Sequence, residues 1–336
     1  MNSEELPYTV HDEQIWHDEL ADFVPERIFD AHVHLFNGTH LPDSVESSWS
    51  FADLNTLRRW AARLYPGRET NFLVLGTPCR EMDVDAHNHW AADQVRQDSA
   101  SRMNRLVTPD CAVASIGSDV ERYGFIGLKP YRIFSTSGDI HQCRIHEFLP
   151  HEQLELANEL ELWVTMHLSR HHGCADEANL RDLREYTTNR YPRIRWILAH
   201  CARSFTYWPI RQAIERLRDL PNIWYDLSAV TDVRPFITLF TQENLDRVFY
   251  GSDGIDSTNF HGQYVALGRA WQGLDTSRFE LNFPHCDGRP ILAIYEQLLS
   301  MKHAAEIAEL TTDDLEKIFW RNATSAFNLG CWPVAT

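Results

Sequence analysis

The chain has 336 residues, of which 43% are hydrophobic and 24% are charged, a composition typical of a globular protein with a large apolar core. Its formal net charge of -17 argues against nucleic acid or an anionic membrane as a partner, because both need a cationic surface. The seven cysteines are dispersed without a Cys-x-x-Cys pair, so we expect reduced thiols and residence in the cytoplasm.

The first informative stretch is 28–34, with the sequence Ile-Phe-Asp-Ala-His-Val-His. Read as a β-strand, its period of two places Asp30, His32 and His34 on one side. Two imidazoles then project together from the end of an apolar strand, where one divalent metal could bind both. A solvated surface pair is the alternative for this motif taken alone.

Apolar runs typical of buried strands alternate with helical patterns along the rest of the chain. The predicted strands are 28–34, 71–76, 103–107, 125–130, 162–167, 194–200, 222–226 and 247–253. The helical patterns between them cover 51–64, 85–99, 112–123, 152–161, 176–188, 210–217 and 235–240, and apolar stripes at 291–299 and 315–326 follow the last strand.

Eight strand–helix units favour one α/β domain, 1–336, folded as a (β/α)8 TIM barrel with extra C-terminal helices. We expect the barrel core to span about 27–330. An open doubly wound sheet is the alternative, and the absence of a Gly-x-Gly-x-x-Gly motif after the first strand counts against it.

Histidine or aspartate ends four of the predicted strands. His32 and His34 end the first, His167 the fifth, His200 the sixth and Asp253 the eighth. In a barrel the C-terminal strand ends converge on one mouth, so these residues meet there although they are far apart in the chain. Each has an ordinary structural interpretation by itself, but together they predict a metal site, with Zn²⁺ as the first choice and Mn²⁺ or Fe²⁺ as alternatives.

The same residues resemble the amidohydrolase superfamily. The motifs that carry the resemblance are Phe-Asp-Ala-His32-Val-His34, the later His167, the turn Ala-His200-Cys and the close Tyr-Gly-Ser-Asp253. The ending Leu315-Glu-Lys-Ile-Phe-Trp-Arg-Asn322-Ala is similar to the branch that includes aminocarboxymuconate semialdehyde decarboxylase-like enzymes. The resemblance implies a mononuclear site with the ligands His32, His34, His167 and Asp253. It also implies that His200 polarises the substrate or moves a proton and that Asp253 is the general base.

Lys129, near the end of the fourth predicted strand, leaves two interpretations open. Binuclear members of the superfamily place a carboxylated lysine there between two metals, and His200 would then bind the second metal. Alternatively, Lys129 and Arg132 bind an anionic group of the substrate, and Arg203 pairs with a substrate carboxylate. We favour one metal. Asp30 could orient a ligand imidazole or make a structural hydrogen bond.

Two other regions carry weaker expectations. The long segment 254–290 is expected to form a loop at the rim of the mouth. His87 and His89 lie two residues apart on a predicted helix, where such a step does not make neighbours, and are expected to be a solvated pair.

These residues favour a hydrolase that uses metal-activated water on an ester, lactone or amide of a small molecule, with acidic molecules among the candidates. The alternative is a metal-dependent, non-oxidative decarboxylase of a small carboxylic acid. Aromatic-acid decarboxylases of the branch resemble this pattern but carry Glu where His32 stands, which favours hydrolysis. A third interpretation is a catalytically silent barrel that binds a ligand. We expect a small-molecule substrate, no nucleic-acid or membrane partner, and a homodimer as one option for assembly.

Overall fold

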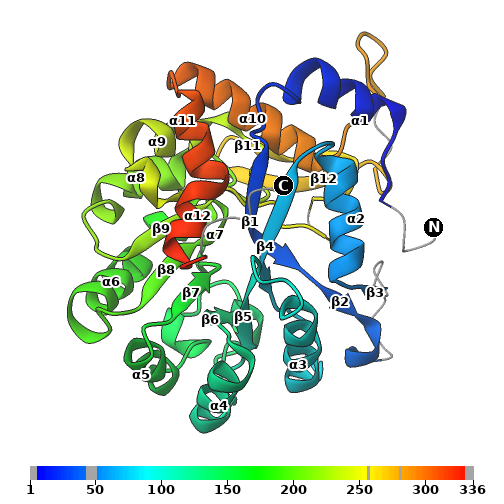
Figure 1. Ribbon diagram of the computed structural model, residues 1–336. Helices are drawn as coiled ribbons and strands as arrows, with labels where there is room; N and C mark the ends of the chain where they lie inside the picture. Colours follow the sequence, from blue (N-terminus) through cyan, green and yellow to red (C-terminus); the bar gives the residue numbers. More distant parts are fainter. Residues whose placement is uncertain (1–5, 43–50, 256–257, 280–281, 330–336) are drawn as a thin grey trace.

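The central sheet of the computed structural model contains eight parallel strands in the order β1-β4-β5-β6-β7-β8-β9-β10 (Figure 1). The structure describes residues 6–42, 51–255, 258–279 and 282–329. The strand bounds are β1 Arg27–His34, β4 Glu69–Leu75, β5 Arg102–Val107, β6 Gly127–Pro130, β7 Trp163–Met166, β8 Arg195–Leu198, β9 Ile223–Asp226 and β10 Val248–Phe249. Each strand predicted from the sequence is therefore present, with its ends shifted by a few residues.

The sheet closes between its first and last strands. The chain after β10 continues beside β1, where the His34 amide donates to the Gly254 carbonyl (2.7 Å) and the Asp253 amide donates to the His32 carbonyl (2.8 Å). Because this contact joins the two edges, the fold is a (β/α)8 TIM barrel, as predicted.

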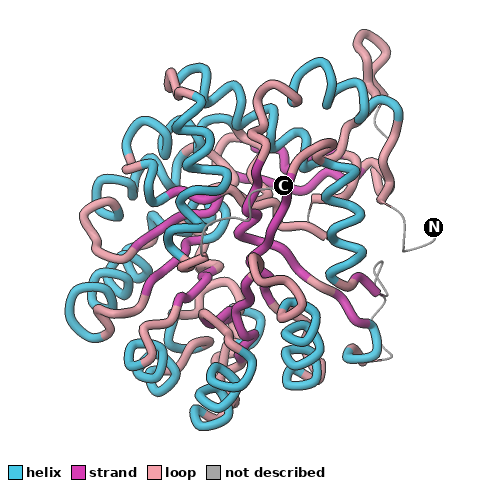
Figure 2. Tube along the Cα trace, in the orientation of Figure 1, coloured by secondary structure: helices cyan, strands magenta, loops and turns pink. Residues whose placement is uncertain are grey.

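Helices cover the outside of the barrel between successive strands (Figures 1 and 2). Their bounds are α2 Leu54–Leu64, α3 Val84–Val95, α4 Val113–Tyr123, α5 His151–Glu159, α6 Glu177–Glu185, α8 Trp208–Leu217 and α9 Val233–Gln242. The segment α7 Ala199–Arg203 follows β8 directly and is largely buried, and its residues 200–203 form a left-handed turn with positive φ. The short α1 Val10–Ile15 precedes the barrel, and α10 Ala293–Ile307, α11 Thr312–Glu316 and α12 Asn322–Ala326 follow it. Within the described residues, no helix combines the length and the apolar character that crossing a membrane requires.

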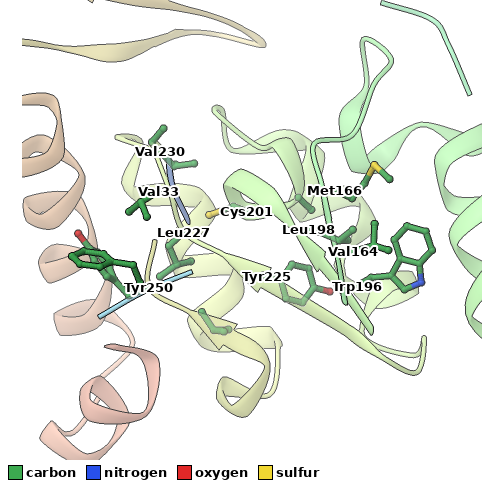
Figure 3. Packing of buried hydrophobic residues seen from close by; sticks show 14 of the residues in the cluster. Val33, Val164, Met166, Trp196, Leu198, Cys201, Tyr225, Leu227, Val230 and Tyr250 are labelled. Carbon is green, nitrogen blue, oxygen red and sulfur yellow. The ribbon is translucent and has the colours of Figure 1, made fainter. Parts of the chain in front are cut away.

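Apolar side chains fill the layer between strands and helices, and Figure 3 shows Val164 and Trp196 of neighbouring strands in it. Aromatic rings fill the N-terminal end of the barrel. Phe327, which follows α12, lies 5.1 Å from the ring of Trp163 and 5.5 Å from that of Phe249. This end is therefore packed by apolar groups, and the polar interior residues lie towards the C-terminal mouth.

The segment after β10 differs from the predicted rim loop. β11 Gly262–Leu267 and β12 Ala270–Asp275 pair there as an antiparallel hairpin. The Thr231 hydroxyl donates to the Tyr264 carbonyl (2.7 Å), which ties the hairpin to the loop after β9. Most hairpin residues are partly or fully exposed, so the sequence lacks the alternation that burial of one face imposes. Two further short strands, β2 Phe36–Asn37 and β3 Phe51–Ala52, also pair.

His87 is buried, and the prediction that it forms a solvated pair with His89 is wrong. Its Nε2 accepts a hydrogen bond from the Thr77 amide (3.3 Å), and burial lowers its pKa to about 3. His89 lies on another face of α3, half-exposed, and contacts Asp119 at 3.1 Å. A helical turn therefore places one imidazole in the core and the other at the surface.

Candidate metal centre

The end of β1 and the chain that follows β10 lie side by side at the C-terminal mouth. The register of β1 against β4 shifts between Asp30 and Val33, so the strict alternation expected from the sequence is broken. His32 and His34 still lie together, with ring centroids 5.3 Å apart. Gly251 permits the close approach of the two segments, because a Cβ at this position would lie 3.0 Å from the Cβ of His32.

Three potential ligand atoms converge here. Asp253 Oδ1 lies 3.2 Å from Nε2 of His32 and 3.2 Å from Nε2 of His34, and all three residues are buried. Burial alone would raise the pKa of Asp253, but the neighbouring imidazoles of His32 and His200 hold it well below its ordinary value. Two imidazole nitrogens and a carboxylate oxygen at this spacing are a donor set that fits a divalent metal.

Asp226, which ends β9, orients the imidazole of His32. Its Oδ2 accepts a hydrogen bond from His32 Nδ1 (2.9 Å), and its Oδ1 accepts from the amides of His200 (3.0 Å) and Ser228 (3.1 Å). Because the Nδ1 proton is directed to this carboxylate, Nε2 of His32 is left facing Asp253. Asp226 is not among the site residues predicted from the sequence, although it ends the seventh predicted strand as His200 ends the sixth.

Two roles were left open for Asp30: to orient a ligand imidazole, or to make a structural hydrogen bond. The structure supports the second. Its Oδ1 accepts hydrogen bonds from the backbone amides of His32 (3.2 Å) and Ser252 (2.8 Å). These bonds hold β1 against the segment that carries Asp253. Asp30 therefore supports the backbone of the site, and Asp226 contacts the imidazole.

His200 lies beside this group, with its ring centroid 5.0 Å from that of His32. Its Nδ1 is 3.0 Å from the Ser228 carbonyl and 2.9 Å from the Ser228 hydroxyl. A carbonyl oxygen can only accept, so the proton resides on Nδ1 and Nε2 presents a lone pair. Burial lowers the pKa of His200 to about 4, which keeps the ring neutral in this environment.

A second group of potential ligands consists of His32, His200 and Asp226. It shares His32 with the first group, and its atoms form hydrogen bonds to one another and to Ser228. The two groups therefore share His32, whose Nδ1 is bonded to Asp226 and whose Nε2 faces Asp253.

His167 follows β7 and lies next to His200, with ring centroids 5.0 Å apart. Its Nδ1 lies 3.2 Å from the Leu168 carbonyl. Burial, followed by the charges of His200 and Arg203, lowers its pKa well below the ordinary value. The structure thus brings three of the four predicted ligands together, while His167 lies outside the groups whose ligand atoms are within 4.8 Å of one another.

Lys129 ends β6 and is fully buried. Its Nζ lies 4.7 Å from the ring centroid of Tyr131 and, within the described residues, has no hydrogen-bond partner. Burial lowers its pKa from 10.5 to about 8, although the carboxylates of Asp226 and Asp253 act in the opposite direction. An unpartnered ammonium group beside a histidine–carboxylate cluster is suited to an anionic ligand.

Arg132 and Arg203 lie in the loops that follow β6 and β8, and both are half-buried. Arg132 Nη1 donates to the Ile140 carbonyl (2.6 Å), and Arg203 Nη1 donates to the Arg170 carbonyl. Both guanidinium groups, together with Lys129, contribute to the low pKa of His167.

Aromatic rings form a wall next to His200. The ring of Phe205 lies 5.2 Å from that of His200, and Trp271 of β12 stacks on Phe205 at 4.1 Å. Tyr264 of β11 lies 5.4 Å from Phe205. These residues are not among those predicted from the sequence, because no motif or periodicity links the hairpin to the loop after β8.

Comparisons with solved structures identify proteins of the same architecture. One is a 5-carboxyvanillate decarboxylase from Sphingomonas paucimobilis (13% identity, TM-score 0.57, 90% of this chain and 99% of that chain). A dihydroxybenzoic acid decarboxylase from Polaromonas sp. JS666, with bound manganese and the inhibitor 2-nitroresorcinol, has 15% identity and a TM-score of 0.56 (91% and 98%). A 4-oxalomesaconate hydratase from Rhodopseudomonas palustris has 16% identity and a TM-score of 0.55 (90% and 96%). At these identities the likeness shows the fold.

Sequence comparisons give the family. No curated protein matches the chain. The amidohydrolase family model matches residues 29–329, which include every candidate site residue described above. The chain therefore belongs to the amidohydrolase family.

Proposed function

We propose that the protein is a metal-dependent hydrolase that acts on an ester, lactone or amide of a small acidic molecule. The observation that carries this proposal is the convergence of His32 Nε2, His34 Nε2 and Asp253 Oδ1 at the mouth of the barrel. A divalent metal held there, Zn²⁺ in the first instance and Mn²⁺ or Fe²⁺ as alternatives, supplies Lewis-acid polarisation of a substrate oxygen and activation of water. We propose one metal, because the two potential groups share His32, whose Nδ1 is already bonded to Asp226. His167 is proposed as a further ligand.

The side chains around the donor set have separate tasks in this proposal. Asp253 is held as a carboxylate, so it can take a proton from water and deliver it to the leaving group. His200 presents the Nε2 lone pair of a neutral ring, which suits proton transfer. Lys129 is the donor available to a developing oxyanion or to a substrate carboxylate, since its ammonium group has no protein partner within the described residues.

A decarboxylase is the second candidate. Two of the solved structures with this fold are named as decarboxylases of aromatic acids, and one of them contains manganese. In this reaction the substrate carboxylate lies beside Lys129, the bond from carbon to the carboxylate breaks with release of CO₂, and a proton from Asp253 or His200 replaces it on carbon. The reaction uses the same residues, but Asp253 or His200 must first carry the proton.

One experiment separates these functions. The protein loaded with Zn²⁺ or with Mn²⁺ is incubated with small esters, lactones, amides and aromatic carboxylic acids, and CO₂ release is measured beside hydrolysis products. Hydrolysis without CO₂ supports the first proposal, and CO₂ release supports the second. Metal content below half an equivalent, with no gain in thermal stability on adding either metal, would contradict both and support the silent barrel.

A further inference from the structure

The hairpin formed by β11 and β12 is largely exposed, yet two hydrogen bonds fix it to the loops of the mouth. The Thr231 hydroxyl donates to the Tyr264 carbonyl on β11 (2.7 Å), and Nε1 of Trp208 donates to the Arg269 carbonyl in the turn (3.3 Å). The Arg269 guanidinium also lies over the ring of Trp208, 5.0 Å from its centroid. The hairpin is therefore held against the loop after β9 and the start of α8.

Trp271 of β12 connects this hairpin to the candidate site. Its ring stacks on that of Phe205, with centroids 4.1 Å apart and an interplanar angle of 23°. Phe205 is 5% exposed, and its ring lies 5.2 Å from that of His200 with an interplanar angle of 32°. Trp271 itself is 41% exposed. Three rings in contact therefore lead from the surface to the candidate proton-transfer group.

The backbone between His200 and Phe205 depends on its surroundings. Residues 200–203 all have positive φ, between 50° and 61°, and the turn closes with the Ser204 amide donating to the His200 carbonyl (2.8 Å). A left-handed conformation is unfavourable for residues that carry a Cβ, so it persists only where neighbouring groups determine it. Contacts that cover the loop after β8 are therefore expected to influence where His200 lies.

Two kinds of contact hold the imidazole of His200. The Ser228 carbonyl and hydroxyl contact its Nδ1, which fixes one edge of the ring. Phe205 packs beside the ring, and Trp271 covers Phe205. Stacked aromatic rings attract each other beyond the effect of the area they bury. Because Trp271 is partly exposed and lies outside the described apolar core of the barrel, its loss should loosen this packing without unfolding the protein.

We propose that Trp271 is a positioning residue, which acts through Phe205 to hold the imidazole of His200 in the orientation that proton transfer needs. This inference rests on the proposed function, in which His200 moves a proton. Trp271 does not touch the reacting atoms. Its role makes the competence of His200 depend on a hairpin that lies outside the barrel.

The chemical reactivity of His200 tests this role without a substrate. Diethyl pyrocarbonate acylates unprotonated imidazole nitrogens, and mass spectrometry of the digested protein gives the rate at each histidine. The full-length protein is treated as purified and after loading with Zn²⁺. W271A should raise the rate at His200 by about 5- to 10-fold, the factor that corresponds to a lost aromatic contact. The half-exposed His89 is the internal reference and should change by less than about twofold.

Further variants assign the effect to the stacked rings. W271F keeps a stacking ring and should stay within about twofold of the unmodified protein. L267A is the matched control, because Leu267 lies on the same hairpin and is 71% exposed. F205A should raise the rate at His200 at least as much as W271A, and the double variant should not exceed F205A, since Trp271 acts through Phe205. Melting temperatures identify variants that do not fold, and W271L or F205L then replaces the alanine variant.

The outcomes separate positioning from general stability. A change at His200 of less than twofold in W271A would overturn the inference. Equal increases at His200 and His89 would also overturn it, because the whole fold would then be loosened. A double variant more reactive than F205A would do the same, because Trp271 would then act by another route.

The outcomes also separate this role from the proposed reaction. With a substrate in hand, W271A should lower kcat by about 10-fold and leave KM within about twofold. A raised KM with unchanged kcat would show that Trp271 binds the substrate, and would overturn the positioning role. Increased reactivity confined to His200, in a protein that hydrolyses and decarboxylates nothing, would support the role of Trp271 and refute the proposed function.

Discussion

The barrel mouth has two halves with opposite charge balance. The histidine–carboxylate half consists of His32, His34, Asp226 and Asp253, with Lys129 in the field of the two carboxylates, and the cationic half consists of Arg132 and Arg203. In the first half, each carboxylate contacts at least one imidazole at 2.9–3.2 Å. In the second half, the structure records no carboxylate partner for either arginine among the described residues, and their hydrogen bonds go to backbone carbonyls.

The difference indicates what each half is built to receive. Buried charges destabilise a fold unless a partner compensates them, so uncompensated charge marks a place where a ligand completes the structure. The histidine–carboxylate half offers lone pairs to a cation, and the cationic half offers N–H donors to an anion. The ring of His200 lies 5.0 Å from that of His32 and 5.0 Å from that of His167, so these three imidazoles are neighbours at the mouth.

The largest loss of activity should follow removal of the Asp253 carboxylate from the histidine–carboxylate half. D253N replaces the oxygen that both imidazoles contact and removes the candidate base, so we expect activity to fall by about 10³-fold. Turnover of a substrate found among the candidate esters, lactones, amides and aromatic acids, together with metal content by elemental analysis, checks this. D219N, an exposed acid at the opposite end of the barrel, should behave as the unmodified protein. Normal turnover by D253N would refute the assignment.

A smaller loss should follow substitution of Asp226. D226N keeps the shape of the side chain but weakens its hydrogen bond to His32 Nδ1. Loss of a group that orients a ligand imidazole typically changes metal affinity by about 10- to 100-fold. D30N is the comparison, because Asp30 contacts backbone amides, and it should change metal affinity by less than about threefold. Competition with a chelating indicator measures both. Equal losses in the two variants would contradict the separate roles given to these carboxylates.

Substitution of Lys129 should stabilise the metal-free protein while weakening carboxylate binding. Burial lowers the pKa of Lys129 to about 8, below the value near 10.5 in an unfolded chain, so the folded state disfavours the charged form. The penalty is fully present below pH 8 and shrinks between pH 8 and 10.5, where the folded protein loses this proton before the unfolded chain does. K129M should therefore raise the free energy of unfolding by about 2 kcal/mol at pH 7 and by less at pH 10. Urea unfolding at both pH values tests this, and a less stable K129M would contradict it.

The smallest effect is expected at an imidazole–carboxylate pair outside both halves. His261 Nε2 lies 2.9 Å from Asp12 Oδ2, the same separation as in the pair His32–Asp226. Burial alone would raise the pKa of Asp12, but hydrogen bonds from His261, Thr9 and the Leu292 amide lower it below its ordinary value. The stability it contributes is therefore complete above the ordinary carboxyl pKa and is lost as pH falls through the lowered value.

D12N should accordingly reduce the free energy of unfolding by about 1 kcal/mol at pH 7 and by less at pH 3. Urea unfolding at the two pH values measures this, and metal affinity should not change. A loss of metal affinity in D12N would show that imidazole–carboxylate pairs far from the mouth also change metal binding, through the stability of the fold. The effect of D226N could then not be assigned to the contact of Asp226 with His32.

The strand ends explain why much of the site could be anticipated. His200 and Asp253 each end an apolar run, and burial on both faces gives a parallel strand a continuous hydrophobic pattern that needs no alignment to detect. Asp226 has the same position and was not singled out, since a single acid at a strand end more often has a structural role. The hairpin that carries Tyr264 and Trp271 had no comparable signal, because neither of its faces is buried.

The sequence by itself determined the eight strand–helix units and the set of histidines and acids at their ends, because buried strands and helices show as local patterns of apolar residues. Only the tertiary structure decided which of these groups meet. Closure of the barrel brings Asp253 to His34 across 219 residues, and a left-handed turn fixes Arg203 relative to His200. Charge compensation likewise depends on neighbours in space. Only the folded structure therefore shows that, among the described residues, Lys129 has no hydrogen-bond partner and that Arg132 and Arg203 bond backbone carbonyls.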